Sequence, residues 1–257
     1  MSPADELLPL LRKLRLSGVM QTLELRTTQA VEDNLSQSEF LFRLLSDEVE
    51  RRESKQLEQR IRRACFEHQK TLEDFDFLFN SALPKAKIID LATCSFIDRR
   101  QNVLLVGPTG VGKSHLAQAL GHRACRAGKT TLYVPAHQLF KQLRAGRGDG
   151  TYDRQLHRFA SVELLILDDL ALRPLTGEEP LDLYEVIRSR HERASTVVTS
   201  NRSVVELSKI FGDPLLSSAA MDRLLQGAHV IVIEGESYRN PSRRKSGLLI
   251  EKQEVEK

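Results

Sequence analysis

Eight consecutive residues contain the groups needed to hold a chain of phosphates: Gly107-Pro108-Thr109-Gly110-Val111-Gly112-Lys113-Ser114. They fit the pattern G-x-x-x-x-G-K-[ST] of a phosphate-binding loop, or P-loop. The glycines let backbone N–H groups curve around phosphate oxygens, Lys113 can reach the β- and γ-phosphates, and the Ser114 hydroxyl can bind Mg²⁺. The pattern therefore predicts a site for a nucleoside triphosphate with magnesium.

The residues on both sides supply the context that this pattern needs. Val103 to Val106 form an apolar β-branched run that predicts a buried strand. His115 to Leu120 are rich in good helix formers, and a helix N-terminus adds partial positive charge beside the phosphates. Strand, glycine loop and helix in this order argue against a chance glycine turn.

Two carboxylates, Asp168 and Asp169, follow a second apolar run, Leu164 to Leu167. A carboxylate at a strand end can hold Mg²⁺ in a Walker B arrangement, which predicts a metal-site role for Asp168. Asp169 stands where a general base or a water-orienting carboxylate is needed for attack on the γ-phosphate. The alternative is a helix cap or a turn, but the spacing of about fifty-five residues from the P-loop favours catalysis.

Three more polar residues stand near the ends of predicted strands. Asn201 ends the run from Ser195, and a polar residue at the carboxyl end of a parallel strand faces the ligand crevice, where it can bond the γ-phosphate or water. Arg223 precedes the last predicted strand and Arg239 follows it. An arginine that contacts the γ-phosphate in the transition state can raise the rate of phosphoryl transfer by about 10³–10⁵-fold. A turn at Asn201, and surface arginines or an ion pair with Asp222, are the structural alternatives.

The elements that must position these residues form two regions and a tail. Predicted strands at 103–106, 131–134, 164–167, 197–200 and 230–233 are separated by helical stretches, which predicts an α/β fold with a parallel five-stranded sheet. Residues 1–72 are predicted to form a small all-α domain, 73–241 the nucleotide-binding domain, and 242–257 a basic irregular tail.

The N-terminal region is predicted to be helical throughout. Ser36 to Glu39 fit a capping box, after which apolar residues recur at helical spacing. A further helix is predicted from Glu50 to about Gln69, and its other faces carry an excess of basic residues: Arg51, Arg52, Lys55, Arg60, Arg62 and Arg63. Arginine pairs well with phosphate oxygens, so this helix is a candidate DNA surface, with a merely solvated face as the alternative.

Composition sets the broad class. The chain has 257 residues, 40% of them hydrophobic, and a formal charge of +3, so any nucleic-acid hypothesis must rest on where the charges lie. The three cysteines contain no C-x-x-C pair, which favours buried thiols in a reducing cytoplasm over disulfides or a zinc site. No apolar run has the length of a membrane span. A soluble cytoplasmic protein is expected.

Taken together, these motifs resemble the AAA+ ATPases of the initiator and helicase-loader branch, and most closely the IstB-like transposition helper proteins of bacterial insertion sequences. The resemblance covers nearly the whole chain. The motifs that carry it are Gly107 to Ser114, Asp168-Asp169, Thr199-Ser200-Asn201, Met221-Asp222-Arg223-Leu224, Ser237-Tyr238-Arg239, and two N-terminal segments, Leu11 to Gly18 and Leu72 to Asp76.

The resemblance implies ATP and Mg²⁺ as cofactors, slow ATP hydrolysis, and a role for each polar residue. Asn201 would be sensor 1, Arg223 the arginine finger of a neighbouring subunit, and Arg239 the sensor 2 arginine of its own subunit. ATP would then bridge the subunits of a homo-oligomer. Family members bind and bend duplex target DNA and stimulate a partner transposase. Fewer than twenty residues follow Arg239, so the C-terminal lid is expected to be truncated or absent.

The segment from Ala136 to Ala160 resembles the helical insertion that lines the nucleic-acid channel in this branch. Helices are predicted at 138–144 and 152–159, with a turn at 146–150. Basic side chains that can neutralise phosphates are Lys141, Arg144, Arg147, Arg154 and Arg158. No base-reading register is evident, so little sequence specificity is expected. A solvated basic turn is the alternative.

Two other functions fit parts of the sequence. A replicative helicase loader would use the same P-loop, aspartates and arginines, but its N-terminal region should expose an apolar patch for a protein ring rather than a basic face for duplex DNA. The arginine-rich run from Arg51 to Arg63 favours duplex DNA. A small-molecule kinase is disfavoured by the paired aspartates, the two arginines and the helical N-terminal region.

Overall fold

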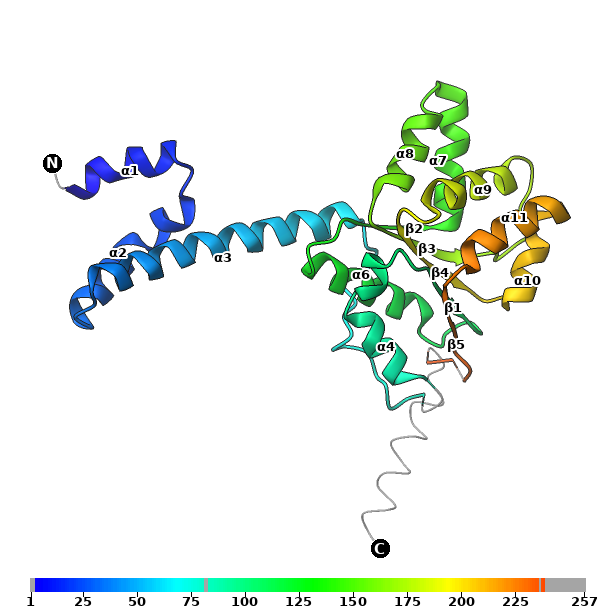
Figure 1. The fold of residues 1–257 in the computed structure, drawn as a ribbon, viewed down its shortest axis with the longest axis horizontal. Helices are drawn as coiled ribbons and strands as arrows, with labels where there is room; N and C mark the ends of the chain where they lie inside the picture. Colours follow the sequence, from blue (N-terminus) through cyan, green and yellow to red (C-terminus); the bar gives the residue numbers. More distant parts are fainter. Residues whose placement is uncertain (1–2, 81–82, 236, 239–257) are drawn as a thin grey trace, which may run out of the picture. The chain divides into compact units, whose positions relative to one another are not determined.

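A computed structural model describes residues 3–80, 83–235 and 237–238 (Figure 1). By its contacts the chain divides into two compact units, Met1–Gln59 and Arg60–Lys257. The predicted boundary at residue 72 lies thirteen residues further along (72 − 59). The division into a DNA-binding domain and a nucleotide-binding domain stays a prediction, because contacts within the chain do not show what each part binds. The predicted tail from residue 242, and Arg239, lie outside the described residues.

The helices and strands alternate in the order that the sequence predicts for the second unit. In chain order they are α1 Pro3–Lys13, α2 Ser17–Glu32, α3 Gln37–Ala64, α4 Lys85–Ala92, α5 Ser95–Asp98, β1 Val103–Val106, α6 Lys113–Arg126, β2 Thr131–Pro135, α7 Ala136–Asp149, α8 Tyr152–Ser161, β3 Leu164–Leu170, α9 Glu179–Arg190, β4 Ser195–Ser200, α10 Val204–Ser208, a 3₁₀ turn Lys209–Phe211, α11 Pro214–Leu225 and β5 His229–Val232.

The first unit contains α1, α2 and most of α3. The predicted capping box is present, because Glu39 N donates to Ser36 Oγ at 3.3 Å and Ser36 N donates to Glu39 Oε2 at 2.9 Å. The prediction of a separate helix from Glu50 to Gln69 was wrong: α3 runs without a break to Ala64. No glycine or proline interrupts it, and it ends where Cys65 adopts a positive φ of 58°.

A buried carboxylate joins α2 to α3 within this unit. Glu48 is only 4% exposed, and its side chain accepts hydrogen bonds from the backbone N–H groups of Gly18 and Val19 at the start of α2. Arg52, one turn later on α3, donates to the other oxygen at 2.7 Å. The negative charge therefore stabilises the N-terminal end of α2, where the backbone donors lack helical partners.

The second unit is built on a five-stranded sheet in the order β2-β3-β4-β1-β5. Every neighbouring pair is parallel, with Val103 opposite both Val197 and His229. The predicted fold class and all five predicted strands are confirmed. Parallel strands require both faces to be covered, which is why four of the five strands are buried along almost their whole length.

Two apolar clusters cover the two faces of the sheet. The helices that contribute to them flank the sheet in Figure 1. On one face, residues such as Leu105 and Ile166 pack against α4, α5 and α6. On the other face, their chain neighbours Leu104 and Leu165 pack against α7 to α11. Alternate residues of a strand point to opposite faces, so each strand contributes to both clusters. The sheet is the rigid layer that fixes where each strand ends.

The α7–α8 hairpin corrects one prediction about the insertion. Gly146 to Asp149, predicted as a turn, are the last residues of α7, and the chain reverses only at Gly150, whose φ is 74°. Gly146 is helical where the two helices approach closely, since an added Cβ would lie 3.0 Å from the backbone of Tyr152. The insertion is therefore a tighter hairpin than the glycine spacing suggests.

A fully buried arginine fastens the end of this hairpin to the sheet. Arg190 donates to the carbonyl oxygens of Phe159, Val162 and Ser195, and its Nε donates to Thr196 Oγ1 at 3.0 Å. Burial lowers its pKa to about 9, so the side chain remains charged at neutral pH. Its charge satisfies carbonyls at the C-terminal end of α8, where helices lack donors.

Replacing Arg190 with alanine is expected to lower the free energy of unfolding by about 3–5 kcal/mol, because several buried carbonyls lose their donor. Urea denaturation measures the change. Arg188→Ala, two residues away and exposed, is the matched control and should cost less than about 1 kcal/mol. Equal effects of the two variants would contradict the role given to Arg190.

Candidate functional site

The P-loop is shaped by close contact with the segment that follows β5. Gly107 and Gly110 have positive φ angles of 150° and 89°. A Cβ on Gly107 would lie 2.0 Å from the carbonyl oxygen of Ile233, and one on Gly110 would lie 2.0 Å from Ser237 Oγ. Tyr238 N also donates to Gly110 O at 3.0 Å. These glycines are therefore required both by conformation and by packing.

Lys113, at the start of α6, lies where the P-loop pattern predicts. It is 4% exposed, and its Nζ donates to Gly107 O at 2.8 Å, to Pro108 O at 2.7 Å and to Asn201 Oδ1 at 2.6 Å. Asn201 follows β4, the neighbour of β1, so parallel pairing brings these residues together. Since the amide oxygen of Asn201 accepts from Lys113, its Nδ2 group is the part that can donate to a phosphate or a water.

The two aspartates lie inside β3 rather than after it, which corrects the predicted end of this strand. Pairing with β4 is irregular between Leu167 and Leu170: three residue steps on β3 match two on β4. This bulge places Asp169 in the left-handed region at a φ of 53°. Bulges change the direction of side chains at functional sites. Here both aspartates line the same cavity as Lys113.

Two hydroxyl groups orient the Asp168 carboxylate, and neither was predicted as a site residue. Tyr133 of β2 donates to Oδ2 at 2.7 Å, and Thr199 of β4 donates to Oδ1. Thr199 Oγ1 also accepts from Asp169 N at 2.8 Å, so it holds both aspartates. Burial and the Asp168 contact raise the pKa of Tyr133, which keeps its proton on the phenol. The sequence signals were a lone tyrosine within an apolar strand and the motif Thr199-Ser200-Asn201, in which only Asn201 was given a role.

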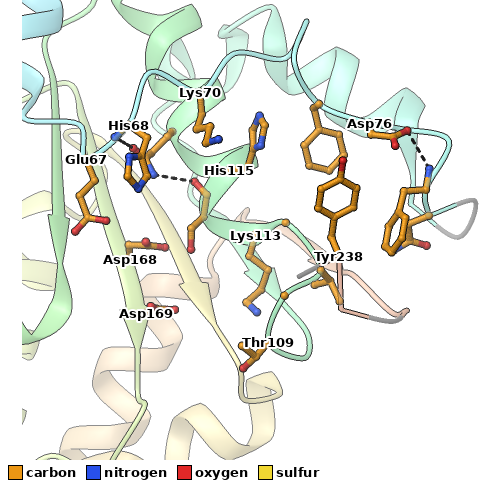
Figure 2. Close-up of a pocket in the computed structure, with 18 of the residues that line it drawn as sticks. Glu67, His68, Lys70, Asp76, Thr109, Lys113, His115, Asp168, Asp169 and Tyr238 are labelled. Atoms are coloured by element: carbon orange, nitrogen blue, oxygen red, sulfur yellow. Dashed lines mark hydrogen bonds between the residues drawn. The ribbon is translucent and has the colours of Figure 1, made fainter. Parts of the chain in front are cut away.

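The cavity at the P-loop has a volume of about 750 Å³ (Figure 2). Figure 2 shows Asp168 and Asp169 on one side, Tyr238 on the other, and Lys113 between them. The segment from Phe66 to Asn80 covers a further side. Three contacts attach this segment to the rest of the unit. His68 N donates to the Gln118 side chain, and Thr71 O is hydrogen-bonded to the His115 ring. The Phe79 and Tyr238 ring centroids lie 4.7 Å apart. The volume suits a nucleotide, with rings available for its base.

Two histidines of α6, the half-buried His115 and the buried His122, make this region sensitive to pH. His115 bonds Thr71 O at 2.9 Å, and His122 stacks on Phe66 with ring centroids 4.4 Å apart. Burial lowers the pKa of both imidazoles below their ordinary value. Below pH 6.5 the unfolded chain therefore binds more protons than the folded chain, and stability is lost as pH falls.

The free energy of unfolding is accordingly expected to decrease between pH 7.5 and pH 5.0. The double variant His115→Gln/His122→Phe should show a weaker dependence, because it lacks the two groups that must be charged at low pH. Urea denaturation at each pH provides the measurement, with His137→Gln on the exposed surface of α7 as control. An unchanged pH dependence in the double variant would rule out this origin.

The structure places Arg223 away from the cavity of its own chain. It lies in the last turn of α11, where Nη1 donates to Ala219 O at 2.8 Å and the guanidinium lies 5.6 Å from the Tyr184 ring. Among the described residues that line the P-loop cavity, Arg223 is absent. Ser237 and Tyr238 do reach the P-loop, whereas the next residue, Arg239, lies outside the described part of the chain.

The basic residues predicted to contact DNA differ in their surroundings. On α7, Arg147 makes two bonds to Asp182 at 2.8 and 2.6 Å, and Arg144 pairs with Glu179 at 3.2 Å. These pairs fasten α7 to α9. Lys141 and Arg154 are exposed, and Arg158 bonds Gln142. On α3 the solvent-facing members are Arg52, Lys55, Arg62 and Arg63.

The donor set at the aspartates suits Mg²⁺. Asp168 and Ser114 both line the cavity, and both offer oxygen, the ligand that Mg²⁺ prefers. The described residues contain no group of three or more histidine, cysteine or carboxylate ligands. Nucleotide-bound Mg²⁺ is generally held through one or two protein oxygens together with phosphates and water.

None of the described helices combines the length and the apolar character needed to cross a bilayer.

Comparisons with known proteins identify the family. The model of the IstB-like ATP binding protein family matches residues 9–246. An insertion-sequence protein of Mycobacterium tuberculosis, described as ATP-binding, is 40% identical over 230 residues, which cover 89% of this chain and 92% of that protein. The corresponding protein of insertion sequence IS21 from Pseudomonas aeruginosa is 36% identical, covering 95% of this chain and 92% of that protein.

Solved structures agree on the fold. AMPPCP-bound DnaA from Aquifex aeolicus superposes with a TM-score of 0.56 at 21% identity, over 67% of this chain and 52% of that chain. This likeness shows the AAA+ fold alone. The family match, the P-loop geometry and the cavity that Lys113 and Asp168 line lead to one conclusion: the chain belongs to the IstB-like family of ATP-binding proteins.

Proposed function

We propose that this protein is an ATP-dependent DNA-binding helper of an insertion-sequence transposase. It assembles on duplex target DNA as an oligomer bridged by ATP, bends the DNA and stimulates the transposase. The observation that supports this most directly is the family match over nearly the whole chain, combined with a P-loop cavity that holds Lys113, Asp168, Asp169 and Asn201 together.

In the proposed reaction, the oxygen of a water molecule attacks the γ-phosphorus, the bond from that phosphorus to the β-γ bridging oxygen breaks, and ADP and phosphate leave. Asp169 orients the water and accepts its proton, while Lys113 and Asn201 Nδ2 contact the γ-phosphate. Ser114 and Asp168 would hold Mg²⁺, which neutralises charge on the β- and γ-phosphates when bound. Tyr133 and Thr199 keep the Asp168 carboxylate in one orientation.

The last contact in this proposal comes from another subunit. Arg223 does not line its own cavity, so its charge serves the nucleotide of a neighbour. Such head-to-tail contacts build rings or helical filaments. Arg239 is proposed to act as the sensor 2 arginine in its own subunit, since Tyr238 beside it bonds the P-loop.

Affinity for random duplex DNA is expected to increase with ATP and to fall steeply with salt. If three exposed basic residues of α7 and α8 contact phosphates, raising salt from 50 to 200 mM should weaken binding by roughly 40-fold per subunit. Fluorescence anisotropy with a labelled random duplex, with and without ATP, provides the measurement. A complex that is insensitive to salt would contradict a phosphate-based interface.

A helicase loader is the second candidate, and one observation favours it. Along α3 the apolar side chains of Leu41, Phe42, Leu45 and Val49 are each more than half exposed, as expected for a protein-docking surface. Comparing ATP-dependent binding to duplex and to single-stranded DNA, with imaging of the oligomers, separates the two functions. Preference for single strands would favour the loader and contradict the transposition helper.

A further inference from the structure

The backbone around Asp169 has a conformation that strands do not normally adopt. Asp169, near the end of β3, has a φ of 53°, and Ala171, just beyond the strand, has a φ of 69°. Two residues that are not glycine therefore lie in the left-handed region within three positions. This region costs energy for any residue with a Cβ, and it persists only where neighbouring groups hold the backbone in place.

This conformation determines where the Asp169 side chain points. Consecutive residues of a regular strand point to opposite faces of a sheet, which would separate the carboxylates of Asp168 and Asp169. The irregular pairing with β4 changes the direction of the strand, and both carboxylates line the P-loop cavity (Figure 2). A return to regular strand geometry would therefore move the Asp169 carboxylate away from the nucleotide.

Two side chains at the end of β4 bond the backbone of this irregular stretch. Ser200 Oγ donates to Leu170 O at 2.7 Å, and Arg202 Nε donates to Ala171 O at 2.7 Å. Arg202 N also donates to Ser200 Oγ at 3.1 Å, so the two contacts form one network. Leu170 and Ala171 are only 2% and 5% exposed, so water is poorly placed to replace these donors.

The segment that supplies these donors is itself bonded to the P-loop. Gly107 N donates to Ser200 O at 3.2 Å, and Asn201 accepts from the P-loop lysine at 2.6 Å. The backbone that carries Asp169 is thus held in place relative to the P-loop. Arg202 is not among the described residues that line the cavity. Within one chain, its effect on hydrolysis must pass through the groups that it bonds.

We propose that Ser200 and Arg202 are positioning residues for Asp169. By holding the carbonyl groups of Leu170 and Ala171, they keep the backbone in its left-handed conformation and the Asp169 carboxylate beside the attacking water. The proposal rests on the proposed function, which assigns the orientation of that water and the acceptance of its proton to Asp169. It adds two residues that act on the reaction through the backbone, without contact with the nucleotide.

The test substitutes Arg202 in the full-length protein, because Ser200 is completely buried and its replacement would also disturb packing. Arg202→Ala removes the donor to Ala171 O. Arg123→Ala, an exposed arginine of α6 that does not line the cavity, is the matched control. Steady-state hydrolysis gives kcat and KM for ATP, titration with a fluorescent ATP analogue gives affinity, and urea denaturation shows that each variant is folded.

Arg202→Ala is expected to lower kcat by about tenfold or more, which corresponds to one charge-assisted hydrogen bond, while ATP affinity stays within about twofold. The double variant Arg202→Ala/Ala171→Gly then tests the mechanism. Glycine adopts a positive φ without the cost of a Cβ, so the left-handed conformation should persist without Arg202 and kcat should return to within about threefold. A glycine could not replace an arginine that acts through its charge.

An unchanged kcat in folded Arg202→Ala, equal to that of Arg123→Ala, would overturn the proposal. A loss of kcat that Ala171→Gly does not restore would also overturn it. Asp169→Asn separates this result from the proposed function. Ordinary hydrolysis by Asp169→Asn would refute the role of Asp169 itself, and with it the proposal. Slow hydrolysis by Asp169→Asn, combined with rescue of Arg202→Ala by glycine, would support both.

Discussion

Replacing Lys113 with alanine is expected to weaken ATP binding by about 100-fold or more and to abolish ATP-dependent assembly. The Lys113 Nζ lies within 2.8 Å of two P-loop carbonyls and of Asn201, so it is already positioned at the mouth of the loop. Each charge-assisted bond that it makes to a phosphate contributes about 1.5–3 kcal/mol, and two such bonds account for the expected loss. Titration with a fluorescent ATP analogue measures it.

The matched control for this variant is Lys87→Ala, an exposed lysine of α4 that does not line the cavity. It removes the same charge and should leave ATP affinity unchanged. Because Lys113 is buried, thermal unfolding of both variants should be compared with that of the unaltered protein, which separates loss of a ligand contact from loss of the fold. A folded Lys113→Ala protein with ordinary ATP affinity would show that the loop does not hold the triphosphate.

Replacing Arg223 with alanine is expected to leave ATP affinity within about twofold and to reduce hydrolysis by about 10³–10⁵-fold, the range found when an arginine finger is removed. The reason is geometric. Arg223 bonds its own helix and lies near Tyr184, whereas the cavity that would hold ATP is lined by other residues. Its charge therefore cannot contribute to ground-state binding within one chain. A phosphate-release assay, run beside the binding titration, separates these quantities.

Mixing experiments distinguish action between subunits from a local effect. Arg223→Ala subunits keep an intact P-loop and Asp169, while Asp169→Asn subunits keep an intact Arg223. If Arg223 acts on a neighbour, the mixture should hydrolyse ATP although each variant alone does not. Full hydrolysis by Arg223→Ala alone, or an inactive mixture, would contradict this role.

Local sequence was sufficient for the elements that depend on neighbouring residues. The P-loop could be predicted because its glycines, lysine and serine all lie within eight consecutive residues. An apolar run precedes these residues, and residues that favour a helix follow them. The capping box at Ser36 and Glu39 was predicted for the same reason. The five strands followed from apolar runs that alternate with helical stretches.

Predictions failed where an element continues through residues that usually interrupt it or where tertiary pairing extends it. Helix α7 continues through Gly146, because glycine permits close approach to Tyr152. Strand β3 continues through Asp168 and Asp169, because β4 lies beside it and a bulge absorbs the extra residue. Both outcomes depend on partners that lie elsewhere in the chain.

The orientation of the candidate site could not be predicted for a similar reason. Tyr133 and Thr199 reach Asp168 from two different strands, 35 and 31 residues away in sequence. Arg147, which stays predicted as a DNA contact, also pairs with Asp182 on α9. The sequence around a basic residue does not indicate which distant carboxylate the fold will place beside it.

By itself, the sequence determined that this protein has a P-loop α/β domain with paired aspartates, because those motifs are short, contiguous and chemically specific. Only the tertiary structure decided which atoms orient Asp168, which aromatic rings surround the cavity, and that Arg223 lies with other arginines near the amino ends of the strands, whereas the P-loop follows a carboxyl end. Parallel strands bring together residues far apart in the chain, and hydrogen bonds, burial and charge at a site depend on those neighbours.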